Sequence, residues 1–289
     1  MQPTVVSAVS NQFLEGNNIT TLDEIAAFVP GLQILIQNPN VPSIAIRGIS
    51  EEDSQSSAIP RVSTFQDGIY LGKGRGAVVE VFDVKSVDVY KGPQTVFFGR
   101  TVQSGAINMV QNKAKNLEEG TIKVGGGAFD SKYASGVYNR PIIKDKLFAR
   151  VAAIYDFQDG FVKSFEGDNY NGKETFALRA LLRYQIQKNT TIDVVGNFQR
   201  DTPPTAGFKS AVIGQPDANK NRFGALALTK GDDLGMDRGV YSLTALLNHN
   251  FSDKWQGKAN IGYRNFDAVD VFDIDGSPLR LQQALRRLL

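Results

Sequence analysis

The second half of the chain alternates apolar and polar residues with a period of two. Residues 147–157 are the clearest run: every second side chain is apolar, and Arg150 and Asp156 lie on the opposite face. The same alternation recurs at residues 121–127, 132–139, 176–186, 192–198, 241–251 and 255–263. This period is typical of β-strands with one apolar face. We therefore expect about seven antiparallel strands after residue 120.

Residues 1–115 follow a different, mixed pattern. In residues 18–28 the apolar side chains recur at helical spacing, Thr20 or Thr21 can cap the helix, and Pro30 with Gly31 ends it. Short apolar segments follow, most of which predict strands, at residues 33–36, 43–47, 63–70, 78–82, 85–90 and 106–110. We therefore expect two parts: an α+β domain at residues 1–115 and a sheet of long strands at residues 116–289.

The runs of the second part have the length of membrane-spanning strands, about 9–11 residues. Aromatic side chains gather near their ends, as in the interfacial girdle of an outer-membrane barrel: Tyr155, Phe157, Tyr184, Tyr241, Phe251, Trp255 and Tyr263. Short connections at residues 139–145 and 187–189 contrast with a long one at residues 201–238. These features favour a transmembrane β-barrel, although a soluble β-sandwich would show the same alternation.

Composition removes several classes of chemistry. The 289 residues include no Cys and one His, His249, which excludes disulfides, cysteine-bound zinc and multi-histidine metal sites. Lys and Arg number 32 against 30 Asp and Glu, and a net charge of +2 does not favour nucleic acid as a partner. No run of about 18 apolar residues occurs, so we expect no transmembrane helix. We expect no catalytic residues, no metal site and no cofactor.

The most specific motifs lie between Ile46 and Val110. In chain order they are Ile46-Arg47-Gly48, Phe65-Gln66-Asp67-Gly68-Ile69-Tyr70, Gly74-Arg75-Gly76, Val87-Asp88-Val89-Tyr90-Lys91-Gly92-Pro93-Gln94, Phe97-Phe98-Gly99-Arg100 and Ser104-Gly105-Ala106-Ile107-Asn108. In order and spacing they resemble the plug domain of TonB-dependent outer-membrane receptors. Lys91 stands where that family usually has Arg, and Ser104 stands where it usually has Gly. Neither difference breaks the resemblance.

The resemblance covers the whole chain and implies a β-rich fold. A small α+β plug domain would be followed by an incomplete antiparallel transmembrane β-barrel. The family's barrel has 22 strands, of which the chain supplies about seven. Neither a signal peptide nor the TonB box, the peptide that couples the receptor to TonB, precedes Pro3. We therefore expect a fragment of a longer receptor.

The resemblance also implies roles for individual plug residues. Contacts with the barrel are expected from the basic residues Arg47, Lys91 and Arg100. Glycine permits tight turns and close backbone approach, and such turns are expected at Gly48, Asp67, Gly68, Gly92, Pro93, Gly99 and Gly105. The segment from Gly72 to Gly76 lacks the spacing of a phosphate-binding loop. By resemblance, it faces the ligand through Lys73 and Arg75.

As function, the resemblance implies energy-coupled uptake of a scarce ligand, most often an iron–siderophore chelate, at the outer membrane of a Gram-negative bacterium. The implied partners are TonB, outer-membrane lipid and a small-molecule ligand, with no enzyme activity and no nucleic acid. Two alternatives stay open: a passive outer-membrane channel and a soluble β-rich carbohydrate-binding protein. The N-terminal domain argues against the first, because a porin has no such plug.

Overall fold

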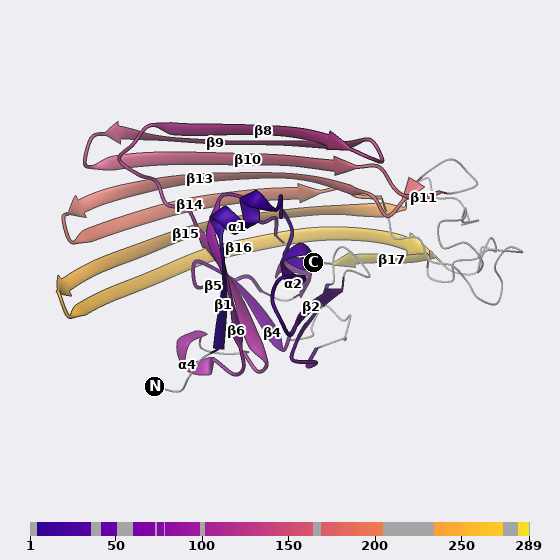
Figure 1. The fold of residues 1–289 in the computed structure, drawn as a ribbon, viewed down its shortest axis with the longest axis horizontal. Coiled ribbons are helices and arrows are strands. Elements are labelled where there is room, and N and C mark those ends of the chain that lie inside the picture. The colour runs from indigo at the N-terminus through magenta and orange to yellow at the C-terminus, as the bar shows by residue number, and fades with distance from the viewer. Residues whose placement is uncertain are drawn as a thin grey trace, which may run out of the picture.

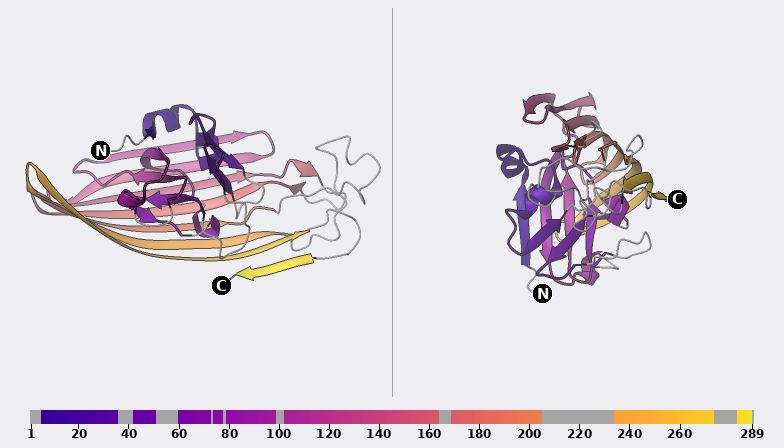
Figure 2. Two further views of the ribbon diagram at one scale, coloured as in Figure 1. Left: turned by 90° about the horizontal axis from the view of Figure 1, so that it is seen from below. Right: turned by 90° about the vertical axis from the view of Figure 1, so that its right-hand side faces the viewer.

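The chain forms two main β-sheets, a small one early in the sequence and a long one after it (Figure 1). The computed structural model describes residues 5–35, 42–50, 60–72, 74–77, 79–98, 102–163, 169–204, 234–273 and 283–288. The long sheet curves, and the first domain lies on its concave side (Figure 2). None of the described helices is long and apolar enough to cross a membrane.

Residues 5–111, here called the plug, are built from short elements. They are β1 (Val5–Ser10), α1 (Asn11–Gly16), α2 (Leu22–Ala26), β2 (Leu32–Leu35), β3 (Ser43–Ile46), β4 (Val62–Gln66), β5 (Ile69–Tyr70), α3 (Gly74–Ala77), β6 (Val84–Lys91), α4 (Thr95–Phe98) and β7 (Gly105–Gln111). The main plug sheet has the order β1-β6-β7-β4-β5, in which β4 runs parallel to β7. Strands β2 and β3 pair as a separate hairpin.

The expected helix at residues 18–28 is shorter in the structure, where α2 covers Leu22–Ala26. A capping box begins it, since the Glu24 carboxylate accepts hydrogen bonds from the N–H groups of Thr20 at 2.7 Å and Thr21 at 3.1 Å. Ile25 of this helix packs into one apolar core with inward-facing residues of the central strands, all fully buried: Val87, Val89, Ile107 and Met109. The plug therefore has a core of its own.

The long sheet continues from the plug in sequence order. Its strands, from one edge to the other, are β8 (Glu119–Gly127), β9 (Ser131–Ile143), β10 (Leu147–Gln158), β13 (Lys173–Gln187), β14 (Thr190–Asp201), β15 (Gly235–Ser252), β16 (Trp255–Asp273) and β17 (Gln283–Leu288). Neighbours pair antiparallel throughout. A small pair, β11 (Val162–Lys163) and β12 (Asn169–Tyr170), lies in the connection between β10 and β13. The incomplete antiparallel barrel expected from the sequence is confirmed.

Some sequence expectations need correction. The strand β9 runs on to Ile143, so the turn expected at residues 139–145 lies instead at residues 144–146. The strands β1 and β17 and the helix α1 were not expected. Strand β1 extends the plug sheet by pairing with β6, from Val5 opposite Lys91 to Ser10 opposite Ser86. Most of the long connection expected at residues 201–238 lies outside the described residues.

Side chains of the long sheet alternate between a face toward the plug and a face away from it. On β10, Val151 and Tyr155 are 45% and 37% exposed, whereas Arg150, Ala152 and Ile154, which point to the other face, are buried. The apolar faces recognised in the sequence are therefore the outer faces. An apolar outer face suits lipid. In addition, a closed barrel leaves no backbone group unpaired in the bilayer.

Adjacent residues of β15 test this orientation. Leu243 is 58% exposed on the outer face, and Ser242 accepts a hydrogen bond from Asn197 at 3.1 Å on the inner face. We expect a polarity-sensitive fluorophore on a cysteine at residue 243 of the full-length protein in lipid vesicles to report an apolar environment. The same fluorophore at residue 242 should report a polar one, and equal spectra at both positions would refute the orientation.

Candidate plug–barrel interface

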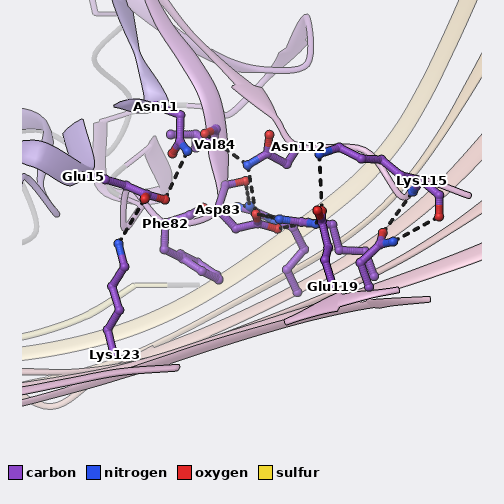
Figure 3. Close-up of polar contacts among 12 residues, drawn as sticks. Asn11, Glu15, Phe82, Asp83, Val84, Asn112, Lys115, Glu119 and Lys123 are labelled. Carbon is purple, nitrogen blue, oxygen red and sulfur yellow. Dashed lines mark hydrogen bonds and ion pairs between the residues drawn. The ribbon is translucent and has the colours of Figure 1, made fainter. Parts of the chain in front are cut away.

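A buried ion pair joins the plug to the inner face of the long sheet just before β6 (Figure 3). The Asp83 carboxylate accepts hydrogen bonds from Arg150 of β10, with Nη2 at 2.5 Å and Nε at 2.8 Å. Their side chains are 2% and 9% exposed. Asp83 has a left-handed φ of 48°, a conformation that Asp and Asn tolerate better than most residues. The third Arg150 nitrogen donates to Glu119 of β8 at 3.1 Å, so the arginine also ties down the first strand.

A second cation, Arg179 of β13, holds the same plug segment, and no carboxylate among the described residues forms an ion pair with it. Its Nη1 donates to the carbonyl of Phe82 at 2.8 Å and to that of Asp83 at 3.2 Å. Its Nε donates to the Asn197 side chain at 2.8 Å, and its guanidinium lies 4.5 Å from the centre of the Phe82 ring. Backbone dipoles and a ring face thus stabilise a buried charge.

The third contact involves Glu80, which is also buried. Its N–H donates to the Gln199 side chain at 3.1 Å, and its carboxylate lies 3.3 Å from Nζ of Lys173, which is closer, at 2.6 Å, to Asp156. Burial raises the pKa of Glu80 to about 7, against an opposing effect of Lys173, and the carboxylates of Asp201 and Asp156 add to the rise. Glu80 is therefore the least well compensated acid of the segment.

Behind Glu80, the wall carries its own buried network. Arg238 of β15 donates to Asp201 of β14 with Nη2 at 2.7 Å and Nε at 2.9 Å. The same carboxylate accepts from Thr175 and Gln199, each at 2.9 Å. Because Gln199 also accepts from the Glu80 N–H, the network fixes the side chain that receives the plug backbone.

A separate polar contact lies at the β4–β5 turn. Asp67 has a φ of 50°, and its carboxylate accepts from the N–H of Gln111 at 3.1 Å and from Nζ of Lys113 at 2.6 Å. Its carbonyl accepts from Asn260 of β16 at 3.2 Å, while Asn108 accepts from the N–H of Gly68 at 3.0 Å. This turn therefore connects the plug sheet, Lys113 just after β7 and the barrel wall.

A cavity of about 1190 Å³ lies between the plug and the wall. Charged side chains of both signs border it, from the plug Glu15, Asp23, Glu24, Glu80 and Asp83, and from the wall Lys123, Arg150, Asp156, Lys173 and Arg238. Lys123 of β8 reaches Glu15 of α1 at 3.3 Å (Figure 3). The volume is large enough for a small-molecule ligand.

Two of the three basic residues expected to contact the barrel lie apart from these ion pairs. Arg47 is exposed at the end of β3 with a φ of 55°, and its N–H donates to the carbonyl of Gly31 at 2.8 Å. Lys91 is half-buried at the end of β6, opposite Val5 and Gly105. Neither forms an ion pair with another described residue. Arg100 lies outside the described residues, so the barrel contacts expected of these three residues stay a prediction.

The other expected residues fall at turns and in one loop. Left-handed φ angles occur at Gly48, Gly68 and Gly92, followed by an exposed Pro93. A Cβ added at Gly105 would lie 2.4 Å from the carbonyl oxygen of Tyr90. The close approach of strands β6 and β7 at this position therefore requires glycine. Gly99 and Lys73 lie outside the described residues, and Arg75 is described only as backbone of α3.

Comparison with known proteins bears on this arrangement. Residues 1–106 match the family model described as the TonB-dependent Receptor Plug Domain. Residues 1–106 are therefore a plug domain of the TonB-dependent receptor type. The ferrioxamine receptor of Yersinia enterocolitica is 24% identical over 272 residues, which are 89% of this chain and 35% of that protein. The ferrioxamine B receptor of Salmonella typhimurium is 21% identical over 90% of this chain and 37% of its own length.

A solved structure agrees with the fold. The ferric yersiniabactin uptake receptor of Yersinia pestis superimposes with a TM-score of 0.82 at 22% identity, over 94% of this chain and 42% of that one. The chain thus spans roughly a third of the length of the two curated relatives. Because the superposition covers 94% of this chain, the likeness in fold extends over both the plug and the strands that follow it.

Sequence reasoning missed the residues that join plug and barrel in this part of the receptor. Asp83 and Arg150 are 67 positions apart, and Glu80 and Lys173 are 93 apart. A usable signal was present, because Arg150 and Arg179 are cations on the inner faces of otherwise apolar strands. A buried cation needs a partner, and here the partners come from the plug.

We expect Asp83→Asn to lower the free energy of unfolding of the plug in the full-length receptor by about 3–5 kcal/mol. The reason is that Arg150 then stays buried without its carboxylate partner. Asn tolerates the left-handed φ of this position, so backbone strain is not added. Hydrogen exchange of the β6 and β7 amides in detergent measures the change. The matched control is Asp237→Asn, which removes an exposed Arg200–Asp237 pair and should leave exchange nearly unchanged. Equal effects of the two substitutions would contradict the assignment.

The raised pKa of Glu80 predicts that its contribution to plug stability falls as pH rises. A carboxyl whose folded-state pKa is about 7 binds its proton more tightly in the seated plug than in the unfolded one between about pH 4.5 and 7, so the stabilisation is lost across that window. The guanidinium midpoint of plug unfolding, followed by a fluorophore at residue 85, should fall more between pH 5.5 and 8.5 in the parent than in Glu80→Gln. A parent midpoint that rises relative to the variant would show that Lys173 dominates instead.

Proposed function

We propose that this chain is part of an outer-membrane receptor for TonB-coupled uptake of a ferric siderophore. In this proposal residues 1–115 act as the plug domain and residues 116–289 as part of the transmembrane barrel. The partners are outer-membrane lipid, TonB and the chelate. Enzyme activity has no place in it, because the described residues supply binding surfaces and ion pairs rather than a nucleophile with its base.

The observation that carries the proposal is a separately folded plug fixed to the inner wall of a curved sheet by buried ion pairs. A passive channel gains nothing from a plug in its lumen. A soluble carbohydrate-binding protein would bury the apolar faces that Val151, Leu182 and Leu243 expose. Energy-coupled transport needs a resting state that stays closed until work is done on it. The Asp83–Arg150 pair supports such a state, because this contact is costly to break.

The siderophore class is supported by the names of the relatives. Two of them are ferrioxamine receptors that match about nine-tenths of this chain, and ferric ferrioxamine B is therefore the first ligand to test. We propose further that Lys73 and Arg75 face the ligand, and that Arg47, Lys91 and Arg100 contact strands of the barrel. The charged cavity beside the plug is large enough for a chelate.

Growth under iron limitation tests the proposal. In a strain whose only siderophore receptor is the full-length protein, we expect ferric ferrioxamine B to support growth, and deletion of either the receptor gene or the gene for TonB to abolish it. The physical reason is that a seated plug closes the lumen until work is done on it. Growth on excess inorganic iron serves as the control and should be unaffected.

The outcomes separate the alternatives. Uptake that persists without TonB would favour a passive channel. Failure of ferric ferrioxamine B alone, with TonB-dependent growth on another ferric chelate, would change the ligand but keep the transporter. A protein recovered without detergent from the soluble fraction would revive the carbohydrate-binding alternative.

A further inference from the structure

One strand of the barrel wall, β16, contacts the plug at several successive inward-facing residues. Four successive inward-facing residues of β16 meet plug residues between the β4–β5 turn and α3: Asn260, Gly262, Arg264 and Phe266. Asn260 donates to the carbonyl of Asp67 at 3.2 Å. A Cβ added at Gly262 would lie 3.0 Å from Cγ2 of Ile69. The intervening Ile261 and Tyr263 are 74% and 63% exposed on the outer face.

Two residues of this row, Arg264 and Phe266, contact the glycine-rich loop. Arg264 donates from Nη2 to the carbonyl of Gly76, near the end of the short turn α3. A Cβ added at Gly76 would lie 2.8 Å from Cδ1 and 3.0 Å from Cε1 of Phe266. Gly76 has no positive φ, so the obstacle to a side chain there is the Phe266 ring, which would have to shift to make room for it. The loop and the wall are therefore in direct backbone-to-ring contact.

Packing beside the row is tight. A void bordered by Asp67, Ile69, Tyr263 and Arg264 has a volume of only about 10 Å³, close to the space of a single water molecule. A loop with glycine at residues 72, 74 and 76 loses much conformational freedom when it is ordered. At its start Leu71 is buried and its N–H donates to the carbonyl of Thr64 at 3.0 Å. At its end the order comes from β16.

We propose that Arg264 and Phe266 are positioning residues for the end of the plug loop, residues 74–77. They hold this loop in one arrangement, so that its affinity for the ligand is set from the barrel wall. The inference rests on the proposed function in one respect, namely that the loop faces the ligand. Preorganisation raises affinity because the entropy of ordering is lost before binding.

The first test needs no ligand. The chain has no Cys, so Arg75→Cys provides a single site for a nitroxide label in the full-length receptor. We expect Gly76→Ala to increase the mobility of the label, because the new methyl group meets the Phe266 ring. Phe266→Ala should increase it less. The double variant should return close to the parent spectrum, since the methyl group then occupies space that the ring has left.

Such compensation of one change by the other is what direct contact produces. Gly239→Ala is the matched control, because a Cβ added at Gly239 of β15 has no atom within 4 Å, and it should leave the spectrum unchanged. Additive loosening in the double variant, or an effect of Gly239→Ala equal to that of Gly76→Ala, would overturn the proposal.

Arg264 is tested by a conservative pair. Arg264→Lys keeps a donor for the Gly76 carbonyl and should keep most of the order, whereas Arg264→Ala should lose it. Heat-modifiable migration on gels shows whether each barrel is closed. If Arg264→Ala fails to close, the lysine variant and the Gly76–Phe266 pair still decide, and an unchanged label spectrum in a closed Arg264→Ala barrel would exclude a positioning role.

The second test measures binding of ferric ferrioxamine B to whole cells. In Gly76→Ala we expect the half-saturating concentration to rise about tenfold, equivalent to about 1.4 kcal/mol, with the amount bound at saturation unchanged. The double variant should recover most of the affinity. An ordered-to-mobile change in the label without any change in affinity would overturn the link to the ligand.

The two tests separate the two ideas. If the parent receptor does not bind ferric ferrioxamine B, the ligand assignment fails, while the label still decides whether β16 positions the loop. If the parent binds and the label does not respond to Gly76→Ala, the positioning proposal fails and the ligand assignment stands.

Discussion

The constraint on which the rest of the structure depends is that charges between the plug and the barrel wall cannot keep their water. Asp83 and Arg150 satisfy each other with two hydrogen bonds, and Arg179 is satisfied by carbonyls, an amide and a ring. The geometry of each contact is narrowly constrained, because a buried charge that loses its partner destabilises the fold by several kcal/mol. The position of the plug against β10 and β13 follows from these few side chains.

The buried ion pairs specify the position of the plug more than they stabilise it. Buried ion pairs contribute little net stability, since desolvation offsets most of their attraction, but they penalise every misplaced arrangement. An interface made of such pairs therefore specifies one position without a large apolar contact holding it there. By contrast, the plug's own core is apolar and continuous, with Val87, Val89, Ile107 and Met109 fully buried. The plug can keep its fold while its contacts with the wall change.

The sequence predicts what repeats locally and misses what is brought together from afar. Alternation around Val151 identified a strand and its outer face, because a period of two is a property of neighbouring residues. No local pattern joins Glu80 to Lys173, 93 positions away, or places Gly76 against Phe266. β1 was missed because its pairing with β6 spans the plug. Resemblance supplied Arg47 and Lys91, but in the described part of the chain acids of the plug meet cations of the wall, and those two residues lie apart from them.

Two kinds of attachment lie next to each other in the chain. Gly76 is held by packing against Phe266 and by a hydrogen bond from Arg264 to its carbonyl. Glu80 and Asp83 are held by ion pairs, to which Glu80 adds a hydrogen bond from its N–H to Gln199. Glu80 is nearer to Gly76 along the chain, and it has the weaker ion pair, a separation of 3.3 Å from a lysine that is closer to Asp156. Asp83 has the stronger one, because Arg150 binds its carboxylate through two nitrogens. The weaker ion pair of this segment therefore lies between Gly76 and the stronger one in chain order, and the strength of attachment differs between residues only three positions apart.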